Sequence, residues 1–136
     1  MIVLDASVAL AWALQEHEHA SAVAALEYAA EHGGHVPGNF ASEIAHGLLQ
    51  AERRKRITEA DVADILSSIL DLPLAVQLPN PHVVVSLARA HGLTAYDAAY
   101  LALALQTQLP LATVDATLGE AAKATKCFWK PKATSI

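Results

Sequence analysis

The sequence predicts an α/β fold in which a central, mostly parallel sheet is covered by helices on both faces. Short apolar runs alternate along the chain with longer segments of helical composition, which is the pattern of strands joined by crossover helices. The chain has 136 residues, 54% of them apolar and 17% charged. It is therefore long enough for one domain with a sizeable core and too apolar for disorder. No repeat or linker divides it, so we expect a single domain over residues 1–136.

Two strands and four helices are expected in the first half. Residues 1–5 form a β-branched apolar run that ends in an acid, typical of a buried strand. Asn39 is suited to cap a helix with a clear apolar stripe, and Thr58 and Asp61 have the spacing of a capping box. The expected elements are strands at 1–5 and 35–36 and helices at 6–15, 18–31, 39 to about 54, and 58 to about 71.

The second half is expected to continue the alternation. Pro73 and Pro79 enclose a short apolar run, which favours a strand between them. Thr94 opens a very apolar helix that again has an acid, Asp97, three residues later. The expected elements are strands at 74–78 and 111–114, helices at 81–90, 94–108 and 116–125, and a last edge strand at 127–129.

Charge is divided unevenly along the chain. The formal net charge is −5, but the first 52 residues hold seven acids and neither Lys nor Arg, and the rest hold nine bases and seven acids. This balance excludes a protein that coats nucleic acid by charge alone. The single cysteine, Cys127, excludes an internal disulfide and a Cys-rich zinc site. The apolar N-terminus is too short for a membrane span and poor as a signal peptide, so we expect a cytoplasmic protein.

Four acids fall at similar structural points. Asp5 and Asp115 follow predicted strands, whose carboxyl ends border the ligand-binding edge of an open α/β sheet. Glu43 and Asp97 lie in the first turns of predicted helices. Each acid alone is explained by helix capping or by the helix dipole. Together, four carboxylates in an apolar pocket would repel one another unless a cation held them, and oxygen ligands suit Mg²⁺ or Mn²⁺. The predicted chemistry is phosphodiester hydrolysis.

The segments around these acids also resemble a known family. In order, spacing and flanks, MIVLDASVAL, EIAHGL, LTAYDAAYLALA and LATVDATL are similar to the motifs of PIN-domain nucleases, and the size is similar to VapC-type toxins of toxin–antitoxin pairs. The resemblance runs from residue 1 to about 128. It implies a three-layer α/β/α fold, metal-dependent cleavage of RNA, a cognate antitoxin and a homodimer. It also implies catalysis and metal ligation by Asp5, Glu43, Asp97 and Asp115.

Three further residues are candidates for supporting roles in this site. Ser7 and Thr113 match the family's hydroxyl positions beside the first and last acids, and would orient a carboxylate or a metal-bound water. His46 occupies a position where the family often has Asn. It lies one helical turn from Glu43, so it is either a supporting partner of the site or an exposed helix histidine.

One dense basic run follows the helix that carries Glu43. Its functional interpretation is an RNA-contacting patch beside the acidic site. Its structural interpretation is a solvated helix end whose bases complement the dipole. The run consists of Arg53, Arg54, Lys55 and Arg56.

Other sites and functions have weaker support in the sequence. Residues 16–19, Glu-His-Glu-His, look like metal ligands by composition, but their spacing favours a surface turn. A catalytically inactive PIN-like module that binds another protein remains an alternative to the nuclease. A phosphatase of the phosphoaspartyl type would need a second acid two residues after Asp5, where this chain has Ser7.

Overall fold

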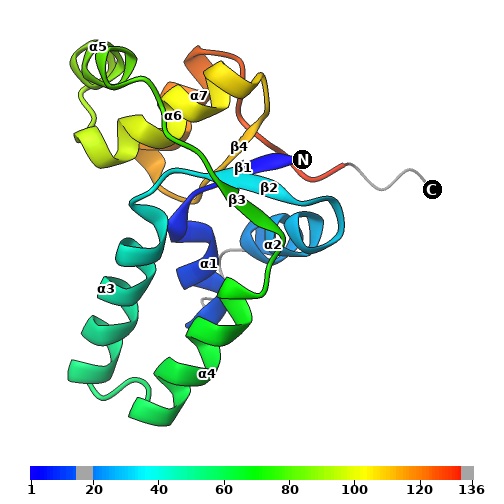
Figure 1. The fold of residues 1–136 in the computed structure, drawn as a ribbon, viewed down its shortest axis with the longest axis vertical. Coiled ribbons are helices and arrows are strands. Elements are labelled where there is room, and N and C mark those ends of the chain that lie inside the picture. The colour runs from blue at the N-terminus through cyan, green and yellow to red at the C-terminus, as the bar shows by residue number, and fades with distance from the viewer. Residues whose placement is uncertain (15–19, 133–136) are drawn as a thin grey trace.

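A computed structural model describes residues 1–14 and 20–132 and confirms the predicted three-layer α/β/α class (Figure 1). Within these residues the sheet has four parallel strands in the order β3-β2-β1-β4. The strands are β1 (Ile2–Leu4), β2 (Gly34–Val36), β3 (Leu74–Val76) and β4 (Leu111–Ala112). The helices are α1 (Ala6–Ala13), α2 (Ala20–His32), α3 (Phe40–Arg53), α4 (Glu59–Leu70), α5 (Pro81–His91), α6 (Ala95–Thr107) and α7 (Ala116–Ala124).

The helices form one layer on each face of the sheet. Figure 1 shows α1 to α4 on one side, with α3 and α4 extending away as a pair, and α5 to α7 on the other. The α6 helix packs against β1, β2 and β4, and residues 98–104 of it are buried throughout. A helix that is apolar all round belongs inside a protein, which is what its sequence predicts.

The centre of the sheet is β1, whose three residues are fully buried. Beside it, a Cβ at Gly34 would collide with the backbone oxygen of Ile2, so glycine allows β1 and β2 to approach. The chain runs from β1 to β2 on one side and returns with β4 on the other. The carboxyl ends of β1 and β4 therefore border a topological switch point, where open α/β sheets bind ligands.

Most predicted elements are confirmed, but three strands are shorter than expected. The first begins at Ile2, the third ends at Val76, and the fourth ends at Ala112. After Val76, one further sheet-type bond joins the Gln77 N–H to the Val36 oxygen at 2.9 Å before the chain turns away. The predicted last strand is reduced to one parallel bridge between Leu111 and Phe128. The expected starts or ends at residues 15 and 18 lie outside the described residues.

The prediction that Asn39 is the N-cap residue of α3 is confirmed, although its side chain does not cap the helix. Asn39 occupies the N-cap position, but its backbone is helical and its side chain makes no capping bond. The amide instead donates to the Glu43 carboxylate at 3.1 Å and to the Tyr96 backbone oxygen at 3.4 Å. A charged acceptor within reach is a better partner for this amide than a helix N–H.

Candidate active site

Asp5 is the most buried acid of the proposed site. It follows β1 directly, and only 4% of it is exposed. Its Oδ2 accepts hydrogen bonds from the Ser7 hydroxyl at 2.5 Å and from the Thr113 hydroxyl at 2.7 Å. Asp5 also occupies the N-cap position of α1, yet it makes no side-chain capping bond there. The carboxylate is therefore held by one hydroxyl group from the first turn of α1 and one from the residue after β4, and it accepts no bond from the helix N–H groups.

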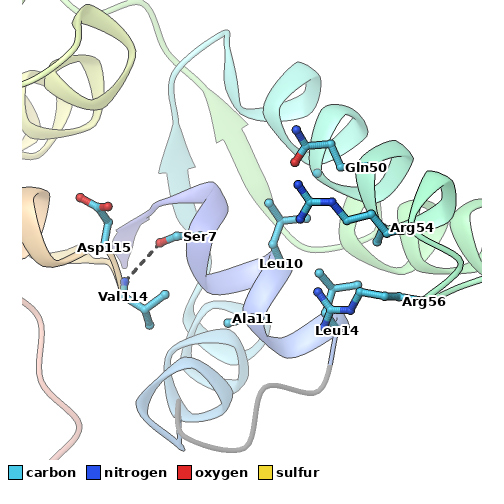
Figure 2. Close-up of a pocket in the computed structure, with 11 residues that line it drawn as sticks. Ser7, Leu10, Ala11, Leu14, Gln50, Arg54, Arg56, Val114 and Asp115 are labelled. Carbon is cyan, nitrogen blue, oxygen red and sulfur yellow. Dashed lines mark hydrogen bonds between the residues drawn. The ribbon is translucent and has the colours of Figure 1, made fainter.

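The same hydroxyl groups connect Asp5 to the end of β4. The Asp115 N–H donates to the Thr113 hydroxyl at 3.0 Å, and the Val114 N–H donates to the Ser7 hydroxyl at 3.2 Å (Figure 2). Asp115 caps α7, because its Oδ2 accepts from the Leu118 N–H at 2.8 Å. Its structural interpretation as a cap is therefore correct and leaves Oδ1 available.

Glu43 lies in the first turn of α3 and is held from two other directions. Its Oε2 accepts from the Asn39 amide and from the Tyr100 hydroxyl, which comes from α6. Tyr100 is fully buried, and burial followed by its bond to Glu43 raises the pKa of its hydroxyl, so the group remains a donor. The sequence reasoning missed Asn39 and Tyr100. A tyrosine one helical turn after Asp97 was the available signal.

Asp97 differs from Asp61 although both follow a threonine by three residues. In α4 the capping box is complete, since the Thr58 N–H donates to Asp61 and the Asp61 N–H donates to Thr58. In α6 the Asp97 N–H donates to the Thr94 hydroxyl at 3.1 Å, but the reciprocal bond to the carboxylate is not formed. The Asp97 carboxylate therefore lacks the backbone N–H partner that Asp61 has, and its remaining hydrogen-bond partner is the Thr94 side chain.

The charges of the four acids act on one another. Burial, followed by the charges of Asp97 and Glu43, raises the pKa of Asp5 to about 6, against the opposing effect of its two hydroxyl donors. Burial also raises the pKa of Glu43, with a smaller contribution from Asp97. Burial, followed by the charge of Asp115, raises the pKa of Asp97 against the opposing effect of its hydrogen bond with the Thr94 side chain. A bound cation would stabilise the charged forms of all three carboxylates and so lower their pKa values again.

The cluster has the donor chemistry of a hard-cation site. All its candidate ligands are carboxylate oxygens, which suit Mg²⁺ or Mn²⁺. None of the four acids forms an ion pair with a Lys or Arg among the described residues. Hydrogen bonds hold Oδ2 of Asp5, Oε2 of Glu43 and Oδ2 of Asp115, so one oxygen of each remains for a ligand. As they lie, no three His, Cys, Asp or Glu side chains within residues 1–14 and 20–132 form a group that could hold a metal ion.

The basic run is split by the turn that ends α3. The Arg56 N–H bonds to the Ala51 oxygen and the Lys55 N–H bonds to the Glu52 oxygen, both at 2.9 Å, while Lys55 has a φ of 60°. This is the Schellman arrangement of a helix C-terminus. Arg54 and Arg56 line a pocket that also includes Ser7 and Asp115, as Figure 2 shows. Arg53 and Lys55 do not line it.

The remaining candidates lie apart from the carboxylates or outside the description. His46 is exposed, and no hydrogen bond joins it to Glu43. The acidic and histidine-rich residues 16–19 lie outside the described residues. None of the described helices has the length and apolar character needed to cross a membrane.

Comparisons with known proteins agree with the geometry. The family model of the PIN domain matches residues 2–124. Ribonuclease VapC3 of Pyrobaculum aerophilum is 32% identical over 123 residues, covering 88% of this chain and 92% of the relative. Ribonuclease VapC9 of Mycobacterium tuberculosis is 35% identical over 130 residues, covering 91% and 93%. The crystal structure of PAE2754 from Pyrobaculum aerophilum has a TM-score of 0.69 at 24% identity, covering 88% of this chain and 83% of that one.

Proposed function

This chain belongs to the PIN-domain family, and from that premise we propose that it is a Mg²⁺- or Mn²⁺-dependent endoribonuclease that acts as the toxin of a toxin–antitoxin pair. Its similarity to proteins named ribonuclease VapC over nine-tenths of its length supports the substrate and the role. The observation that carries the proposal is the group of four interacting carboxylates at the switch point, with no described basic partner. Capping alone accounts for Asp115 and not for the other three acids.

Asp5, Glu43, Asp97 and Asp115 would hold the cation. When bound, a divalent cation supplies an activated water and polarises a phosphoryl oxygen of the RNA backbone. The protein's own contribution is orientation. Ser7 and Thr113 fix one oxygen of Asp5, and Asn39 and Tyr100 fix one oxygen of Glu43. Fixing one oxygen of each carboxylate limits the rotation of the other, which is how partners of a ligand residue raise its effectiveness.

The expected partners are an antitoxin and a second copy of the chain. A cognate antitoxin follows from the resemblance to VapC-type toxins. The edge strand β3 supports an interface of some kind, because Val76 is 70% exposed and the following Leu78 is 85% exposed. Large apolar side chains at a sheet edge favour association. Light scattering of the purified protein would distinguish a monomer from a homodimer.

The test of the nuclease proposal is RNA cleavage by four proteins, with Mg²⁺, Mn²⁺ or a chelator present. Wild type, Asp5→Asn, Asp97→Asn and Asp64→Asn are compared. Asp64 is an exposed acid on α4, so its variant loses the same charge away from the site. We expect wild type and Asp64→Asn to cleave with metal, and the other two to lose cleavage by orders of magnitude.

Two outcomes would contradict the proposal in different ways. Equal cleavage by wild type, Asp5→Asn and Asp97→Asn would show that the carboxylates are not the site. No cleavage by wild type, together with no heat of Mg²⁺ binding in calorimetry, would favour the alternative of an inactive PIN-like module that binds a protein. One observation favours the inactive module: among the described residues, no three His, Cys, Asp or Glu side chains are already arranged to hold a metal ion.

A further inference from the structure

A pocket of about 360 Å³ lies between α1, the end of α3 and the segment after β4. It adjoins the carboxylate cluster, because Ser7 and Asp115 form one of its ends, and it extends from there away from Asp5, Glu43 and Asp97, which do not line it. Its volume is at the small end of the roughly 300–1,000 Å³ that is usual for ligand pockets. Figure 2 shows the two guanidinium groups of Arg54 and Arg56 at the end opposite Asp115.

The pocket has an apolar wall and polar ends. Leu10, Ala11 and Ala51 contribute to the wall, while the Gln50 amide lies at its rim with Arg54. The α1 and α3 helices approach closely here, as Gly47 shows: a Cβ at this position would lie 2.6 Å from a methyl carbon of Leu10. A flat apolar group fits such a wall, an amide can read the edge of a base, and guanidinium groups bind phosphate.

The two ends of the pocket are too far apart to contact the same phosphate group. Ser7 and Leu14 both line it and are 14 − 7 = 7 residues apart along α1, which is about 10 Å at 1.5 Å per residue. Arg54 and Arg56 lie at the far end, so their charges are positioned for a phosphate other than the one at the carboxylate cluster. The Schellman turn at Lys55 brings both arginines to this pocket and leaves Arg53 and Lys55 off it.

We propose that this pocket binds one nucleotide of single-stranded RNA beside the cleaved bond, with its base against the α1–α3 wall and its phosphate on Arg54 and Arg56. The proposal rests on the proposed nuclease function and adds the place where the enzyme reads a neighbouring base. It explains how a chain with a net charge of −5 and a cluster of acids holds a polyanion: two cations are placed along the substrate's path. Gln50 is the residue positioned to distinguish one base from another.

Two pairs of variants with the same charge change test the phosphate contact. Arg54→Gln with Arg56→Gln removes the pocket cations, and Arg53→Gln with Lys55→Gln removes two cations beside the pocket. All four residues are exposed, so both variants are expected to fold, which circular dichroism checks. We expect the first pair to weaken binding of labelled single-stranded RNA by about 10- to 100-fold. For the Arg54/Arg56 variant, the plot of log affinity against log salt concentration should become less steep by about 0.7, the value for the loss of one phosphate contact. The second pair should have a clearly smaller effect on affinity.

The base contact is tested by sequencing the RNA ends produced from a random single-stranded pool with Mg²⁺ or Mn²⁺. We expect wild type to favour particular bases at one position beside the cut, and Gln50→Ala to weaken that preference while still cleaving. Cleavage by wild type but not by Asp5→Asn, with affinity, salt slope and cut sites unchanged in the Arg54/Arg56 and Gln50 variants, would overturn the pocket and leave the nuclease intact. Loss of binding to a protein partner, with RNA binding unchanged, would also overturn it. Failure of wild type to cleave would count against the nuclease itself.

Discussion

The burial of Asp5 predicts that this carboxylate destabilises the metal-free fold at neutral pH. Its pKa is raised from 3.8 to about 6, chiefly because burial disfavours its charged form. The folded state therefore binds the proton more tightly than the unfolded state does. The contribution of Asp5 to stability should be greatest below about pH 4, fall as the pH rises from about 4 to about 6, and then level off. Asp5→Asn removes the titrating group while keeping an oxygen that accepts from Ser7 and Thr113.

The size of the effect follows from the two pKa values. The difference between 3.8 and about 6, at about 1.4 kcal/mol for each tenfold change in proton affinity, corresponds to about 3 kcal/mol. No discount for solvent screening is needed, because Asp5 is only 4% exposed. Most of this, about 2 kcal/mol, develops between pH 4 and pH 8. It is a large fraction of the roughly 5–15 kcal/mol that usually separates folded from unfolded proteins.

The assay is urea unfolding of wild type and Asp5→Asn in a chelator at pH 4 and pH 8. The gain of the variant over wild type should be about 2 kcal/mol larger at pH 8, and the subtraction cancels any change in packing that does not depend on pH. Asp64→Asn, which changes an exposed acid, should show no such difference. A variant that is equally stabilised or equally destabilised at both values would refute the argument. Replacing the chelator with Mg²⁺ should stabilise wild type more than Asp5→Asn.

Three other substitutions have defined outcomes. Gly34→Ala introduces a collision with backbone, so it should lower the free energy of unfolding by about 1–3 kcal/mol, whereas Gly38→Ala, which has open space, should not; equal effects would contradict the packing argument. Lys55 has a left-handed φ of 60°, which glycine adopts without strain. Lys55→Gly should therefore raise the free energy of unfolding, measured in urea, by about 0.5–1 kcal/mol, and a lower value than wild type would contradict this. Tyr100→Phe removes the hydroxyl group that donates to Glu43, and should lower metal affinity or metal-dependent cleavage by about 10- to 100-fold. Calorimetry and RNA cleavage measure the two quantities, and circular dichroism checks the fold. Unchanged values would exclude a positioning role for Tyr100.

Local chemistry made much of the fold and the placement of the acids predictable. The three residues after Met1 are apolar and begin with two β-branched side chains, and they become a fully buried strand. Thr58 and Asp61 form the predicted capping box, and Asp115 caps the predicted last helix. Because the carboxyl ends of parallel strands meet at one edge, the sequence predicts that Asp5 and Asp115 share that edge, and the structure shows that their strands are neighbours.

Contacts between distant parts of the chain were not predictable in the same way. Tyr100 is 57 residues from Glu43. Its place one helical turn after Asp97 suggests that it faces the site, but the local sequence does not identify Glu43 as its partner. The four bases at residues 53–56 are consecutive in the sequence, but the direction of each side chain depends on a left-handed backbone at Lys55, a conformation that is uncommon for lysine. The turn sends alternate residues to different surfaces, so two of the four bases reach the pocket.

Folding alone does not account for the acids that follow β1 and begin α3 and α6. Asp5 and Glu43 lie at or near helix starts but cap neither helix with their side chains, and Asp97 forms only half of the box that Asp61 completes. The side-chain oxygen of an asparagine at position 5 could accept hydrogen bonds from the same two hydroxyl groups without burying a charge. Three carboxylates whose pKa values are raised by burial and by the charges of neighbouring acids therefore destabilise the metal-free fold. A bound cation offsets that cost directly, so the stability measurement on Asp5→Asn and the metal requirement for cleavage test the same physical claim.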